Sequence, residues 1–386
     1  MTEYDIHIEK IRKEMRSEGA DALLVTSNVN LYYCFGQIVM GYYYIPVEGQ
    51  PLLFIRRPAG LESDNIIYVR KPEQITDILK ERGITPPQSI MLEGDRLSYA
   101  EWMRYAAIFH PAKPMNGTPA IQRARSIKTE AELELIRCSG KLHSDVYRMI
   151  PNIYRRGMTD LEISIEIERE MRRAGCLGVF RVFGQSMEIF MGSVLSGDNA
   201  GEVSPYDFAL GGKGLHPSIP IGADNRVLRQ GTSLMVDMGG NFTGYMTDMT
   251  RTYSIGTLTE KAYKAHQVAL EIQNEVVHIA RPGAVGEDLY SKSLEIAEHN
   301  GLSDCFMGIR QQARFVGHGV GIEVNELPLL GVRSRMELVP GMVFAIEPKF
   351  IIEKIGAVGI ENTFAVTTDE PERLTILNEY IIDLDN

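Results

Sequence analysis

The chain has 386 residues, of which 44% are hydrophobic and 24% charged, and its net charge is −11. This length suits a globular protein with two cores, and the negative charge argues against a nucleic-acid partner, because phosphate binding needs a basic surface. No segment approaches the ~20 apolar residues of a membrane span, and residues 1–16 lack the apolar run of a signal peptide. We therefore expect a cytoplasmic protein without a membrane partner.

Residues 1–124 are predicted to form a small α/β domain. Apolar residues recur at helical spacing before an apolar run that is typical of a buried strand. The expected elements are a helix that carries Ile8, Ile11 and Met15, strands at 21–26, 51–55 and 89–92, and a helix at 73–82.

Five tyrosines gather within residues 31–45 of this domain. They can be ordinary core residues, because a tyrosine can bury its ring and keep its hydroxyl in water. They are also many for a solvated loop, and a surface that one chain cannot bury alone indicates a second copy. We therefore predict a homodimer.

Residues 125–386 are predicted to form a second, α+β domain with two similar halves. Thr129 followed by Glu132, and Thr159 followed by Glu162, are capping boxes that open helices. A helix that Thr257 opens before Glu260, and another over 287–299, repeat the pattern. Each pair of helices is followed by strands.

Residues 235–252 predict a β-hairpin. An apolar run leads to Asp237, Gly239 and Gly240 supply turn chemistry, and the return strand carries Asp248. The midpoint of the two aspartates falls in this turn, so we expect them to be directly opposed. Two carboxylates ~5 Å apart repel unless a cation lies between them.

A second hairpin repeats this arrangement. Apolar strands lead to Glu347 and Glu361, whose midpoint is Lys354, so these residues are also expected to be cross-strand partners. Between the hairpins, His318 lies on an apolar strand between Gly317 and Gly319, which allow close backbone approach. Four carboxylates and one imidazole suit hard or borderline divalent ions, and their charge is enough for two of them.

Each of these residues has a plainer interpretation. An aspartate after an apolar run is often a turn residue, a lone histidine is often a core residue, and Glu361 alone could be a surface charge on an edge strand. The pairing on apolar strands favours the metal site, because unpaired buried carboxylates are costly.

The order Asp, Asp, His, Glu, Glu in VDMGGNFTGYMTDMTRT, GHGVGIEV, AIEP and GIEN resembles the pita-bread metallopeptidases, which include Xaa-Pro aminopeptidase, prolidase and creatinase. The resemblance covers nearly the whole chain and implies a creatinase-type N-terminal domain, a pita-bread catalytic domain and a homodimer. It also implies a metal-dependent hydrolase that cleaves an Xaa-Pro dipeptide or N-terminal Xaa-Pro bond by attack of metal-bound hydroxide.

The resemblance assigns two divalent ions to five residues, with manganese expected and cobalt or zinc as alternatives. Asp248 and Glu361 are expected to bridge the ions, Asp237 to complete one shell, and His318 and Glu347 the other. The resemblance makes Glu347 the catalytic carboxylate as well. It also indicates a substrate-binding role for His216, although the spacing to the first aspartate is longer here than in the family.

Other positions depart from the family pattern. Asn325 stands where peptidases of the family carry a second histidine, and its amide can still donate to an oxyanion without transferring a proton. Lys349 replaces a glycine, Gly359 replaces an arginine, and Asn362 replaces a carboxyl residue. These changes are compatible with hydrolysis, but they leave the specificity for proline peptides open.

Three functions follow. The first is a hydrolase of Xaa-Pro dipeptides or short peptides. The second is a creatinase-like hydrolase or lyase of a small non-peptide substrate. The third, a catalytically silent binding protein, is disfavoured because all five ligands are present and there is no basic tail.

Overall fold

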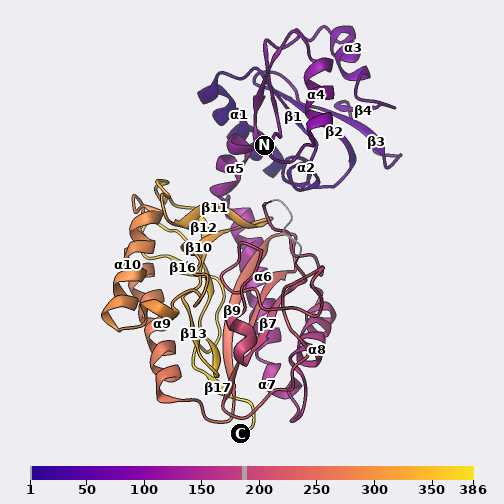
Figure 1. The fold of residues 1–386 in the computed structure, drawn as a ribbon. Helices are drawn as coiled ribbons and strands as arrows, with labels where there is room; N and C mark the ends of the chain where they lie inside the picture. The colour runs from indigo at the N-terminus through magenta and orange to yellow at the C-terminus, as the bar shows by residue number, and fades with distance from the viewer. Residues whose placement is uncertain (1, 185–188) are drawn as a thin grey trace. The chain divides into compact units, whose positions relative to one another are not determined.

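In this computed structural model, the structure describes residues 2–184 and 189–386. Contacts between residues divide the chain into two compact units, Met1–Arg125 and Ser126–Asn386, whereas the sequence places the boundary after residue 124 (Figure 1). Among the described residues, no helix combines the length and the apolar character that crossing a membrane requires.

The first unit has the predicted α/β organisation. Its sheet has the order β4-β3-β2-β1-β5-β6, in which β1 pairs antiparallel with β2 and parallel with β5. The helices are α1 (Glu3–Glu18), α2 (Asn28–Phe35), α3 (Gln74–Glu81), α4 (Tyr99–Ile108) and α5 (Thr118–Ser126). The strands are β1 (Ala22–Val25), β2 (Met40–Pro46), β3 (Leu52–Arg57), β4 (Ile66–Tyr68), β5 (Ser89–Leu92) and β6 (Lys113–Asn116).

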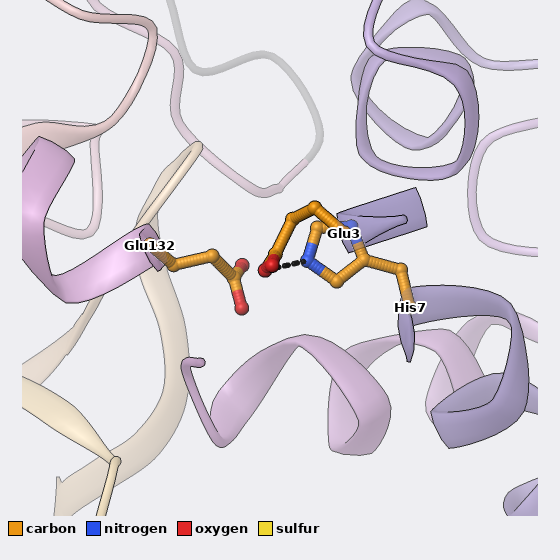
Figure 2. A group of neighbouring side chains, drawn as sticks. All are labelled: Glu3, His7 and Glu132. Atoms are coloured by element: carbon orange, nitrogen blue, oxygen red, sulfur yellow. Dashed lines mark ion pairs between the residues drawn. The ribbon is translucent and has the colours of Figure 1, made fainter. Parts of the chain in front are cut away.

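Helix α1 forms where the apolar stripe predicts it. Thr2 and Asp5 make a capping box at its first turn, which satisfies amides that the helix leaves free. Ile11 is fully buried on the inner face. One turn along the helix, His7 Nε2 lies 3.1 Å from the Glu3 carboxylate (Figure 2).

The tyrosines of residues 31–45 pack inside the first unit. Tyr42 lies edge-on to Tyr105, and Tyr44 stacks on Phe109 with 6.1 Å between ring centroids. Tyr42, Tyr43 and Tyr44 are at most 7% exposed. The idea that one chain cannot bury these rings is therefore wrong for β2, since alternate residues of the strand reach packed layers on both faces of the sheet. The homodimer stays a prediction that rests on the resemblance.

The second unit has the predicted α+β fold with two similar halves (Figure 1). One sheet has the order β17-β9-β8-β7, another β11-β10-β12-β15-β16, and β13 pairs with β14. The helices are α6 (Glu130–Tyr147), α7 (Ile150–Ile153), α8 (Asp160–Arg173), α9 (Glu260–Ile279) and α10 (Gly286–His299). The strands are β7 (Gly192–Ser196), β8 (Thr232–Asn241), β9 (Met246–Ile255), β10 (Phe315–Val320), β11 (Val324–Gly331), β12 (Val343–Ile346), β13 (Lys349–Ile352), β14 (Gly356–Gly359), β15 (Asn362–Ala365), β16 (Glu372–Arg373) and β17 (Ile382–Asp383).

Each half packs a pair of helices against its own strands. One core joins α6 and α8 to β8 and β9, and another joins α9 and α10 to β10 and β12. The predicted capping boxes at Thr129 and Thr159 are confirmed. The N-cap of α9 is Thr259 rather than Thr257, because it is the Thr259 side chain that accepts from the Ala262 amide. Strand β9, which carries Asp248, lies beside β15, which directly follows Glu361.

Candidate metal centre

The first predicted hairpin is formed by β8 and β9, with a register that differs from the expectation. Asp237 lies opposite Thr250, and Asp248 lies opposite Gly239. The aspartates are diagonal neighbours rather than direct partners, because the turn is centred between Thr243 and Gly244, one residue later than the midpoint of the two aspartates. A shift of two residues leaves side chains on the same face of the sheet. Both carboxylates therefore still point to one site.

The second pair of strands has the predicted register. Ile346 pairs with Asn362 on one side of the two glutamates, and Lys349 pairs with Gly359 on the other. Glu347 and Glu361 lie between these pairs and are 4% and 1% exposed. The tip is at Lys354, which has a positive φ of 64°.

His318 reaches the carboxylates from β10, which lies between β11 and β12. A Cβ on Gly317 would meet the Ala345 oxygen at 2.2 Å, and one on Gly319 would meet the Leu327 oxygen at 2.3 Å. Glycine is therefore required on both sides of the histidine for the strands to pack this closely.

The imidazole of His318 faces three of the carboxylates. Its Nε2 lies 3.5 Å from Glu347 Oε1, 3.7 Å from Glu361 Oε1 and 3.9 Å from Asp248 Oδ2. The five residues that the sequence predicts as ligands are thus brought together from β8, β9, β10 and the segments between β12 and β15.

Lys349, which stands where the family pattern has a glycine, enters the same cluster. Its Nζ donates to Glu347 Oε2 at 2.5 Å, Asp237 Oδ2 at 2.8 Å and Glu361 Oε2 at 3.2 Å. The residue is fully buried. Strand alternation is the signal that could have found it, since residues 347 and 349 share one face.

Burial and mutual repulsion shift the titration of the cluster. Burial raises the pKa of Asp248 well above its usual value, and the carboxylates of Glu361 and Asp237 add to this. Burial also raises the pKa of Glu347, and raises that of Glu361 to about 8 although the Lys349 ammonium opposes it. Burial lowers the pKa of His318, so its imidazole is neutral near pH 7 and can offer a lone pair.

One divalent ion fits the group formed by Asp248, His318 and Glu361. Their ligand atoms lie within 4.8 Å of one another. Oε1 of Glu361 is buried and has no hydrogen-bond partner among the described residues, whereas Oε2 accepts from Thr250 at 2.7 Å. Because an unpartnered buried carboxylate oxygen is costly, a cation at this point would stabilise the site.

A second candidate group in the same cluster consists of Asp237, Glu347 and Glu361. It differs from the expected division of ligands, which places Glu347 beside His318 and Asp237 on the other ion. Oxygens of all three residues surround the Lys349 ammonium. With the lysine there, the residues present do not fit an ion at this position.

Neighbouring residues hold the ligands in place. Thr363 Oγ1 accepts from the Asp248 amide and donates to the Asp248 carbonyl, both at 2.9 Å. The buried guanidinium of Arg251 donates to the Glu361 carbonyl and to Asn362 Oδ1. Asn362, where the family has a carboxyl residue, thereby joins a polar network behind the ligands.

A cavity of about 40 Å³ opens beside the cluster. It has room for about three or four waters, since each needs roughly 10–15 Å³. Asn325 lines it from β11 with φ +62°, a left-handed conformation that asparagine tolerates better than most residues. Other residues that line it, which include Phe180, Ser193, Asp207 and Phe208, are not predicted from the sequence.

His216 is not brought to this cavity. It is exposed in the loop between β7 and β8, where its Nδ1 lies 2.8 Å from Ser218 Oγ. It is not among the described residues that line the cavity. Its predicted contact with a substrate stays untested.

Two family models match the chain. Metallopeptidase family M24 matches residues 134–368, and the creatinase/prolidase N-terminal domain matches residues 7–127. The chain is similar to an uncharacterised peptidase of Bacillus subtilis, with 26% identity over 96% of this chain and 99% of the relative. It is also 26% identical to an Xaa-Pro dipeptidase of Pyrococcus furiosus, over 95% of this chain and 97% of the relative.

Solved structures share the fold of the chain. An X-Pro aminopeptidase from Thermotoga maritima aligns with a TM-score of 0.79 at 24% identity, covering 97% of this chain and 99% of that one. An Xaa-Pro dipeptidase from Bacillus anthracis gives the same TM-score and identity over 98% and 99%. The fold is therefore the pita-bread fold expected from the sequence. Together with the family match, it shows that the chain belongs to metallopeptidase family M24.

Proposed function

We propose that this protein is a metal-dependent hydrolase of short peptides, with the Xaa-Pro dipeptide as the substrate class to test first. The observation that carries this proposal is the convergence of four carboxylates and a neutral histidine beside a cavity. The names of two relatives, which the chain matches along almost their whole length, support the choice of substrate, since both are Xaa-Pro dipeptidases.

A divalent ion held by Asp248, His318 and Glu361 would supply a Lewis acid and lower the pKa of water. Glu347 is suited to accept and return a proton. The raised pKa of Glu347 lies closer to neutral pH, which suits a group that takes up and returns a proton. The residue also lines the cavity. Asn325 is suited to donate a hydrogen bond to the oxygen of the scissile carbonyl. His216 is a weaker candidate for substrate binding because it is exposed outside the cavity.

The proposal is tested by offering the protein Xaa-Pro dipeptides and longer Xaa-Pro peptides with manganese, cobalt or zinc. We expect release of proline from dipeptides, lost on chelation and in Glu347→Gln. His216→Ala should retain turnover, because His216 is exposed outside the cavity. A metal-loaded, folded protein that cleaves none of these peptides would contradict the proposal.

A second candidate is cleavage of a small non-peptide substrate. It is favoured by Lys349 within the cluster and by Asn325, both of which depart from the peptidase pattern. The same assay with guanidino and amide compounds separates the two functions. Turnover of these compounds without turnover of any Xaa-Pro peptide would favour this candidate.

Further expectations accompany this function. We propose manganese as the ion, a cytoplasmic location and a homodimer. Sedimentation at micromolar concentration tests the dimer, and a monomer under all conditions would remove it.

A further inference from the structure

We propose that the ammonium group of Lys349 takes the place of one of the two metal ions expected for this centre. The protein would then bind a single divalent ion, at Asp248, His318 and Glu361. This inference concerns the centre on which the proposed function rests, but it predicts how many ions bind rather than which bond is cleaved.

The position of the ammonium excludes an ion at the same place. Nζ of Lys349 lies 2.5–3.2 Å from one oxygen each of Glu347, Asp237 and Glu361. Carboxylate oxygens bind a divalent ion at about 2.0–2.2 Å. An ion bound by these three oxygens would therefore overlap the nitrogen.

The lysine is held where it is. Its side chain is 0% exposed, and its backbone oxygen accepts from the Met307 amide at 2.8 Å. On the opposite strand, Gly359 leaves room for its stem, since a Cβ there would lie 3.1 Å from Lys349 Cγ. To leave, the ammonium would have to give up three carboxylates inside the protein, and an unpaired buried charge is strongly unfavourable.

With the Lys349 ammonium present, a second divalent ion is not needed to neutralise the charge of the cluster. Four carboxylates alone need two divalent ions to approach neutrality. With Lys349 as a fixed positive charge, one divalent ion brings the four carboxylates and the neutral His318 within one charge of neutrality. The lysine thus neutralises part of the negative charge from which two ions were expected.

Lys349 acts here as a positioning residue. An ammonium has three N–H donors, and each has a carboxylate partner. None is left for a substrate. Its effect passes through Glu347, whose Oε2 it holds while Oε1 faces His318 at 3.5 Å.

Counting bound manganese tests this inference without any substrate. The protein is loaded with Mn²⁺, freed of excess ion and measured by elemental analysis and electron paramagnetic resonance. We expect one ion per chain and the signal of an isolated ion. Lys349→Ala should bind two ions and show the signal of a coupled pair.

Lys128→Ala is the matched control. Lys128 is also a buried lysine beside a carboxylate, with its Nζ 3.4 Å from Glu326 Oε2, but it lies outside the centre. This variant should keep one ion. Two ions or none in the unchanged protein would overturn the inference, as would a single ion in a folded Lys349→Ala protein.

Two further variants keep the test decisive if Lys349→Ala does not fold. Asp237→Asn should keep one ion, with affinity lowered by no more than about 10–100-fold, because Asp237 faces the lysine and not the ion. His318→Ala should lose the ion, with affinity falling more than about 100-fold. Loss of the ion in Asp237→Asn would show that it binds where we place the ammonium.

The outcome is separable from that of the proposed function. A peptidase that carries two ions would contradict only the inference. A protein with one ion that cleaves no Xaa-Pro peptide would contradict only the function.

Discussion

Lys349 stands directly opposite Gly359 in the ladder between β13 and β14. A Cβ on Gly359 would lie 2.8 Å from Lys349 Cα and 2.4 Å from the Pro348 oxygen. We expect Gly359→Ala to lower the free energy of unfolding by about 1–3 kcal/mol, as overpacking does. Urea unfolding measures this. Gly201→Ala is the control, since its Cβ would find only ordinary contacts, the nearest being 3.4 Å from Ile351, and equal stability of both variants would contradict the prediction.

Removing the ammonium should destabilise the metal-free protein. Lys349→Ala leaves Asp237, Glu347 and Glu361 facing one another without a cation, and loss of one partner of a buried ion pair costs about 3–5 kcal/mol. Added Mn²⁺ should restore much of this loss. Thermal unfolding with and without manganese checks both effects. A variant as stable as the unchanged protein under chelation would show that the lysine is not a counter-ion.

The sequence predicts the cluster well because strand alternation is a strong constraint. Every second residue shares a face, so Asp237 and Asp248 converge even though their predicted register is two residues away from the observed one. Register depends on where the turn is centred, which the turn residues alone do not define. The predicted register of Glu347 and Glu361 is correct, since the observed turn is centred on Lys354.

Strand alternation can place Lys349 on the same face as Glu347, but the sequence does not show that its ammonium contacts three carboxylates. A lysine on a strand usually faces solvent, and here only the folded β8, β13 and β15 region brings three carboxylates to it. The exposure of His216 and the packing of Phe180 over the cavity likewise depend on long loops, for which a single sequence offers no periodic signal.

Metal affinity should rise with pH. Burial raises the pKa of Glu361 to about 8 and that of Asp248 as well, so near pH 6 an ion must displace protons from its ligands. Raising the pH removes these protons. For each proton that the ion must displace, the dissociation constant of Mn²⁺ should fall about tenfold per pH unit, up to about pH 8. Titration calorimetry at several pH values measures it. An affinity that does not change from pH 6 to 8 would contradict the assigned ligands.

The amide of Asn325 should contribute to turnover. If it donates to the oxyanion, Asn325→Ala should slow turnover by about 10²-fold or more without changing metal content. Asn325→Asp is the control for the backbone, because aspartate also tolerates positive φ but lacks the donor, so it should be equally slow. Steady-state kinetics and metal analysis check this. Full activity in either variant would assign the residue to packing alone.

Hydrolysis of an Xaa-Pro dipeptide as a function of added manganese is the most direct test of a peptidase with one metal ion. Metal-free protein is titrated with Mn²⁺ while the release of proline is followed. We expect activity to rise in proportion to the metal, to reach its plateau at one ion per chain and to stay there. Activity that keeps rising to two ions per chain, or that is absent at every level of metal, would contradict this expectation.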